Sequence, residues 1–164
     1  MRHIISVLLE NESGALSRVA GLFSSRGYNI ESLTVAPTND PTLSRMTIVT
    51  VGDERKIDQV EKHLNKLVDV VALQDITVRG HIEREIVLIK LAINAEERDN
   101  LDRIIDAFQA SLSDVVDNQF IVEMSGSSEK VDELIKSLSN ANIIEVVRSG
   151  VIGLASGERA LTVK

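Results

Sequence analysis

The sequence predicts an α+β protein made of two ferredoxin-like βαββαβ domains, each an antiparallel sheet with its helices on one face. Apolar residues switch between strand-like runs and a helical period in the order βαββαβ, and this order occurs twice. The 164 residues are also enough for two small cores. We therefore expect one domain over residues 1–79 and a second over residues 80–164.

The first half opens with the apolar run 3–9 (HIISVLL), which is rich in Ile and Val as buried strands are. An amphipathic helix should follow, because apolar residues recur at the helical spacing in Leu16, Val19, Ala20 and Phe23. Ser13 is placed to cap the start of this helix, and Gly27 is placed to end it.

Two strands are expected next, over residues 30–36 and 44–51, joined by the proline-containing turn PTNDPT. A second helix is predicted by the spacing of Ile57, Val60, Leu64 and Leu67. The run 68–78 (VDVVALQDITV) then returns to strand and completes the first βαββαβ unit.

The second half repeats these elements. Residues 83–93 read as a strand, and residues 113–126 as a strand pair. Two helices are predicted by Leu101, Ile104, Ile105 and Phe108, and by Val131, Leu134, Ile135 and Leu138, the latter helix capped by Ser128. Residues 142–154 are expected as one last strand, followed by a tail that frays or docks. Bare sheet edges in such units invite pairing, so an oligomer is expected.

Composition excludes several classes of function. A net charge of −7 and an aromatic content of 2% argue against a nucleic-acid partner. The absence of cysteine excludes disulfides and thiolate metal sites and is typical of the cytoplasm. No apolar run reaches the ~18 residues of a membrane span, so no membrane contact is expected. His3, His63 and His81 lie far apart, and no nucleophile pairs with a base, so neither a metal site nor a catalytic residue is expected.

The polar turn before the first predicted helix has residue types that suit an amino-acid ligand. A helix start offers unpaired amides to a carboxylate, and Gly14 beside Ala15 permits close approach. Asn11 and Asn29 carry both a donor and an acceptor. An aliphatic pocket would be walled by Leu9, Leu16, Ile30 and Val35. The residues alone favour a plainer alternative, in which they only cap a helix and form turns. The matching turn of the second half, INAEERDNL, has no glycine.

Long stretches of the chain resemble a known family. SVLLENESGALSRVAGLFSSRGYNIESLTVAPTNDPTLSRMTIVTVGDE is similar to the opening of the small regulatory subunits of bacterial acetolactate synthase, also called acetohydroxyacid synthase. The similarity continues through HLNKLVDV and EREIVLIK to IIEVVRSGVIGLASGE, so it covers nearly the whole chain. The segment AEERDNLDRIIDAFQASLSDVVDN is its more divergent part.

The resemblance implies an N-terminal ACT domain, a module that binds small effectors, and a C-terminal domain of similar topology. It implies a homodimer with two ACT domains paired edge to edge and valine bound between them. One chain would supply Asn11, Gly14 and Ala15, and its partner Asn29 and Ile30, with Leu16 and Val35 also in the site. This favours a ligand cradle over a plain helix cap.

The resemblance also implies a chain that has no active site and no cofactor of its own. Members of the family associate with a large catalytic subunit, raise its activity and confer feedback inhibition by valine in branched-chain amino acid biosynthesis. Thiamine diphosphate, magnesium and FAD would belong to the catalytic subunit, and the complex would be cytoplasmic.

Two other functions fit the sequence less well. A free-standing ACT-type sensor of a transcription regulator would need a DNA-reading helix or a basic patch, and the chain has neither. A ferredoxin-like acyl transferase or deaminase would need an activated nucleophile or zinc ligands, which a chain without cysteine and with scattered histidines does not provide.

Overall fold

The computed structural model describes residues 1–163, apart from the side chain of residue 114. The chain divides into two compact units. One unit contains Met1–Ile82 together with the segment from Val151 onward, and the other contains Glu83–Gly150. The boundary near residue 80 lies close to the expected one. The C-terminal segment, expected in the second domain, belongs instead to the first unit.

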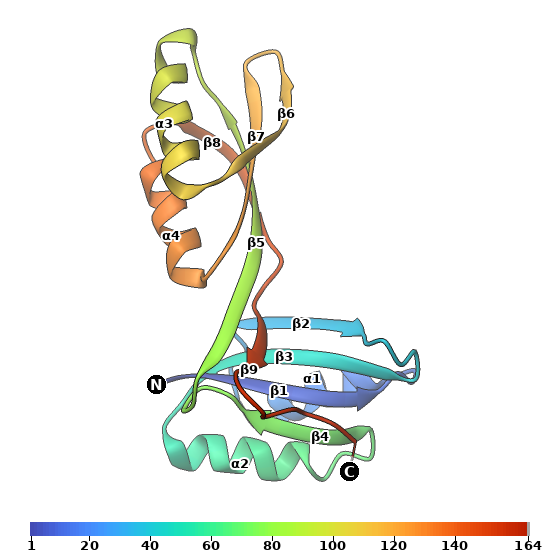
Figure 1. Cartoon of the computed structure of the whole chain (residues 1–164). Coiled ribbons are helices and arrows are strands. Elements are labelled where there is room, and N and C mark those ends of the chain that lie inside the picture. The colour runs from blue at the N-terminus through green and yellow to red at the C-terminus, as the bar shows by residue number, and fades with distance from the viewer. Residues whose placement is uncertain (164) are drawn as a thin grey trace. The chain divides into compact units, whose positions relative to one another are not determined.

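The first unit is a four-stranded antiparallel sheet with two helices (Figure 1). Its elements are β1 (Arg2–Glu10), α1 (Ala15–Ser25), β2 (Ser32–Pro37), β3 (Leu43–Val51), α2 (Glu54–Leu64) and β4 (Val70–Asp75). The strand order β2-β3-β1-β4 places the first strand in the middle, as the predicted ferredoxin-like topology requires. β2 and β4 are the two edges of this sheet.

The core of the first unit lies between the sheet and the two helices. Alternate residues of β1 point into it, and the predicted helix stripes supply Val19, Phe23, Val60 and Leu64, all of them buried. Leu67 packs against this core from beyond the end of α2, although the sequence predicted it within the helix. Gly27, with φ of +65°, follows the end of α1, which confirms its expected role there.

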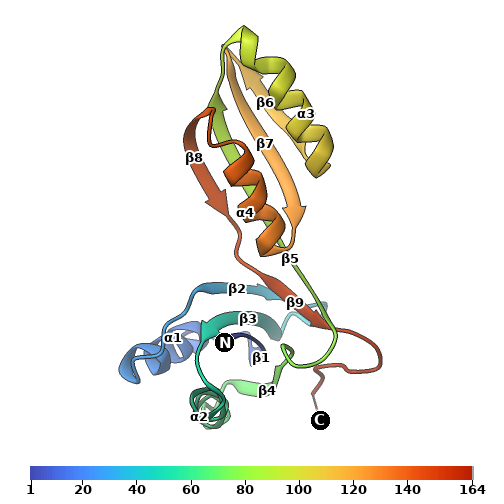
Figure 2. The same ribbon diagram turned by 90° about the vertical axis from the view of Figure 1, so that its left-hand side faces the viewer.

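The opposite face of the first sheet is covered by a strand from the end of the chain, β9 (Ile152–Ala155) (Figure 2). A second cluster of buried residues forms there, made of Ile4, Val49, Ile76 and Val151. Gly153 is essential to this fit, because a Cβ at that position would lie 2.6 Å from Cδ1 of Ile76. The predicted single strand 142–154 is therefore wrong: it breaks at Gly150, whose φ is +82°.

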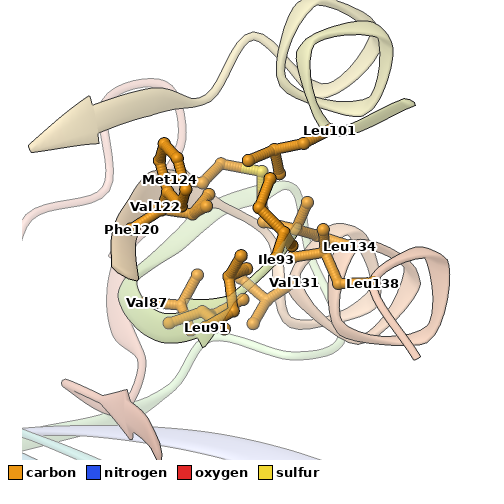
Figure 3. Close-up of a cluster of buried hydrophobic side chains, with 11 residues drawn as sticks. Val87, Leu91, Ile93, Leu101, Phe120, Val122, Met124, Val131, Leu134 and Leu138 are labelled. Atoms are coloured by element: carbon orange, nitrogen blue, oxygen red, sulfur yellow. The ribbon is translucent and has the colours of Figure 1, made fainter. Parts of the chain in front are cut away.

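The second unit repeats the topology, with the strand order β6-β7-β5-β8. Its elements are β5 (His81–Ala92), the 3-10 turn η1 (Ala95–Glu97), α3 (Arg98–Phe108), β6 (Ser111–Val116), β7 (Gln119–Gly126), α4 (Ser128–Ser137) and β8 (Asn142–Arg148). Residues from β5, β7 and both helices form its core, which includes Leu101 of α3 and Met124 of β7 (Figure 3). The first residue of β5 and its neighbour belong to the first unit, and β9 pairs with β5.

The hairpin of the second unit is the shorter one, as its sequence predicts. β6 and β7 are joined by Asp117 and Asn118, both with positive φ, the conformation of a tight two-residue turn. None of the helices in the described part of the chain has the length and apolar character that a membrane span requires.

Candidate functional site

A hollow of about 230 Å³ opens at one end of the first sheet. Four of the predicted site residues line it: Asn11, Ala15, Leu16 and Val35. Its other lining residues are Leu9, Glu10, Glu12, Ala36, Pro37 and Ser44. Gly14 lies in the same loop, which joins β1 to α1 and which we call the entry loop (residues 11–14).

The register of the sheet explains why these residues meet. Leu9 lies opposite Ser44, and Ser44 lies opposite Pro37, so one row of the ladder crosses from the centre of the sheet to its edge. Ser44, Ala36 and Pro37 were not among the predicted site residues, because their proximity to the entry loop depends on this register. The PTNDPT turn marks the tip of the hairpin. Counting residue pairs back from this tip would have placed Pro37 opposite Ser44.

The start of α1 is open. Gly14 precedes it with φ of +88°, and no side chain of the described residues caps its first-turn amides. The amide of Ala15 donates to the carbonyl oxygen of Glu12 at 3.2 Å, which leaves the amides of Leu16 and Ser17 as the open donors. The expected cap by Ser13 is therefore wrong, because the left-handed turn at Gly14 replaces the extended cap residue that such a bond needs. The helical segments elsewhere in the described chain begin with a side-chain cap: Asp53 at α2, Asn94 at η1, which leads into α3, and Ser127 at α4. The last cap falls one residue before the expected Ser128.

Asn11 fastens the entry loop to the turn of the β2–β3 hairpin. Its Nδ2 donates to the carbonyl oxygen of Pro41 at 2.9 Å, and its amide donates to that of Thr42 at 2.7 Å. Asp40 orders the same turn by accepting hydrogen bonds from the amide and the hydroxyl of Thr42. These bonds hold the pKa of Asp40 below its usual value. The side-chain oxygen of Asn11 faces no donor among the contacts found in the described chain and is available to accept.

Two of the predicted site residues, Asn29 and Ile30, do not line the hollow of their own chain. They precede β2, whereas Val35, Ala36 and Pro37 at the hollow form its other end. The main chain of Asn29 is fixed by Thr50, whose hydroxyl donates to its carbonyl oxygen at 2.6 Å. The side chain of Asn29 is exposed.

The hollow brings together groups of several chemical kinds. It combines open amide donors, the acceptor oxygen of Asn11, the carboxylates of Glu10 and Glu12, and aliphatic walls. Among residues 1–163, no group of three or more His, Asp or Glu side chains is placed to hold a metal ion.

The fold and this site define an ACT-type regulatory domain. A family model described as "AHAS small subunit-like ACT domain" matches residues 5–72, and a model described as "Small subunit of acetolactate synthase" matches residues 84–157. The chain belongs to the family of acetolactate synthase small subunits, the regulatory subunits of that enzyme.

Individual relatives are similar to this chain over nearly its whole length. The acetolactate synthase isozyme 3 small subunits of Salmonella typhimurium and Escherichia coli are each 54% identical to it, over 98% of this chain and 99% of theirs. The crystal structure of the acetolactate synthase small subunit from Thermotoga maritima superimposes with a TM-score of 0.89 at 33% identity. It covers 97% of this chain and 99% of that one. Such a small subunit implies a catalytic large subunit as its partner.

Proposed function

We propose that this chain activates the large catalytic subunit of acetolactate synthase and makes it sensitive to feedback inhibition by valine. Valine binds in the hollow of the first unit, at the seam between two copies of the chain. The observation that carries this proposal is the uncapped start of α1, which opens beside a hollow bounded by the edge strand β2.

Each part of the valine molecule has a counterpart in the hollow. The carboxylate takes hydrogen bonds from first-turn amides at the positive end of the α1 dipole. The ammonium group lies toward the oxygen of Asn11 and the carboxylates of Glu10 and Glu12. The branched side chain contacts the aliphatic residues of the wall, Leu9, Ala15, Leu16 and Val35.

A second copy of the chain completes the site. β2 is an edge strand, and two such strands that pair antiparallel run in opposite directions. The beginning of one β2 then lies beside the end of the other. This brings Asn29 and Ile30 of one copy toward Val35 at the hollow of its partner, which accounts for their separation within one chain.

Valine inhibits through the difference between its affinities for two states of the complex. A ligand that bound both states equally would shift nothing. A coupling of about 1–3 kcal/mol changes the population ratio by roughly 5- to 150-fold. In this proposal the chain has no catalytic residue. Thiamine diphosphate, magnesium and FAD are held by the large subunit, and the complex works in the cytoplasm.

The test is calorimetric titration of valine, leucine and isoleucine into the purified chain, with and without the large subunit. Asn29→Ala is the informative variant, because its side chain is exposed and makes no side-chain hydrogen bond that the structure shows within the described chain. We expect wild-type folding and valine binding weaker by about 1–3 kcal/mol, since a polar group of the ligand loses its partner.

Asn65→Ala is the matched control, an identical substitution at an exposed position at the far end of α2. It should leave the affinity for valine unchanged. Wild-type affinity in Asn29→Ala would exclude a site shared between two chains, and a wild-type chain that binds none of the three amino acids would refute the proposal itself.

A further inference from the structure

Arg18, on the exposed side of α1, reaches back to the loop that precedes its own helix. Its Nη2 donates to the carbonyl oxygen of Ser13, in the entry loop, at 3.3 Å. Its Nη1 lies where a Cβ of residue 14 would come within 2.7 Å, so a side chain there would push the guanidinium aside. The glycine at position 14 thus permits both the positive φ and the close passage of this guanidinium.

The same guanidinium forms a two-point ion pair with Asp69, the residue before β4. Nε donates to Oδ2 at 2.5 Å, and Nη2 donates to Oδ1 at 2.7 Å. Asp69 is buried although it is charged. Pairing of this geometry fixes direction as well as distance, because the planar fork of arginine matches the two oxygens of a carboxylate. The ion pair lowers the pKa of Asp69 and raises that of Arg18, so both are charged at neutral pH.

Asp69 also binds the other end of the entry loop. Its carbonyl oxygen accepts a hydrogen bond of 2.9 Å from the amide of Glu10, the last residue of β1. One residue therefore holds Glu10 through its main chain and Ser13 through Arg18. These two contacts flank the residues that line the hollow, Asn11 and Glu12.

We propose that the Arg18–Asp69 pair is a positioning device that holds the entry loop in the shape that binds the effector. Neither side chain is among the lining residues of the hollow, so both act through the loop. This inference rests on the proposed function for its ligand, but the order of the loop is measurable without any ligand.

The first experiment measures valine affinity by calorimetry for Arg18→Ala, Asp69→Asn and the double variant. Each single variant should bind valine about tenfold more weakly, because the binding shape of the loop becomes a minority conformation. The double variant should bind no more weakly than either single one, since both substitutions break the same link. If Asp69→Asn keeps wild-type affinity, the pair does not position the loop.

Arg18→Lys separates geometry from charge. Lysine keeps the positive charge but cannot make the two-point contact with Asp69 and reach Ser13 together, so it should fail to restore affinity. Wild-type valine affinity in Arg18→Lys would show that Arg18 acts only through its positive charge, by long-range attraction of the carboxylate of valine, and not by positioning the loop. The control is Arg55→Ala, which removes an equal charge at an exposed position of α2 in the same unit and should leave affinity unchanged.

The second experiment follows hydrogen exchange in the peptide that covers residues 10–17, without ligand. Exchange there should be faster in Arg18→Lys and Asp69→Asn than in the wild type and in Arg55→Ala, while the helix α2 is unchanged. Unchanged exchange would overturn the inference even if valine does not bind the wild type. In that case the failure to bind would count against the proposed function alone.

Discussion

Glu61, near the end of α2, carries a charge that its surroundings oppose. Partial burial raises the pKa of this carboxyl, and the charges of Asp75 and Asp58 raise it further. The last turn of a helix also disfavours a negative charge. The folded chain therefore holds the proton of Glu61 more tightly than the unfolded chain does. This stabilises the fold at low pH and is lost as the pH rises through the raised pKa.

Replacing Glu61 with Gln should consequently stabilise the first unit at pH 7, by roughly 0.5 kcal/mol. The gain should vanish as the pH falls below about 4, where both the folded and unfolded carboxyls are protonated. Urea unfolding of the two proteins across this range measures the difference. Glu54→Gln is the control at the other end of the helix, where a negative charge is favourable, and it should destabilise. A Glu61→Gln variant less stable than wild type at pH 7 would contradict this account.

At the scale of an element, β9 covers the face of the first sheet that the helices leave open. β2 binds the main chain of Val151, the residue before β9: the hydroxyl of Thr34 donates to the carbonyl oxygen of Val151, and the amide of Val151 donates to the hydroxyl of Ser32, each at 2.8 Å. The amide of Ser156 donates to the carbonyl oxygen of Gly80 at 2.9 Å. The strand that bounds the hollow is therefore also the strand that holds the returning tail.

Gly153→Ala should loosen this tail. The added methyl group would collide with Ile76 and lie 3.2 Å from Cγ2 of Ile4, both fully buried, so the chain must shift. We expect a loss of about 1–3 kcal/mol in the free energy of unfolding, as overpacking usually costs.

Gly21→Ala is the contrasting variant in the same unit. Gly21 lies inside α1, and beyond its chain neighbours and its own helix backbone no atom of the described residues lies within 4 Å of an added Cβ, so alanine should stabilise by about 0.5–1 kcal/mol. Both values come from the midpoints of urea unfolding curves. Equal midpoints for Gly153→Ala and the wild type would show that β9 is not packed on the first sheet in solution.

At the scale of the whole molecule, the proposal requires that two chains associate and that valine strengthens the association. A ligand that binds at the seam favours the paired state by mass action. Sedimentation equilibrium should show a species of twice the 18.0 kDa chain, with a dissociation constant that falls when valine is added. In Asn29→Ala the dimer should persist but lose most of its response to valine. A wild-type chain that stays monomeric at high concentration would contradict a binding site shared between two chains.

Much of this molecule follows from the pattern of its residues. The helix stripes of Val19 and Phe23, and of Val131 and Leu134, predicted buried helix faces because period and burial are local properties of a segment. The repeat of the same pattern predicted two units of one topology. The polar turn with Gly14 was recognised as unusual, although Ser13 was wrongly expected to cap the helix, since the choice between a capped and an open start depends on backbone angles.

The sequence by itself therefore determined the two βαββαβ units, their buried faces and the residues of the entry loop. Only the tertiary structure decided that β9 covers the first sheet, that Ser44 and Pro37 meet the entry loop, and that Arg18 joins Asp69. The physical reason is that periodicity specifies which face of an element is apolar. Which distant segment covers that face is set by register, close packing and ion pairing between residues far apart in the chain.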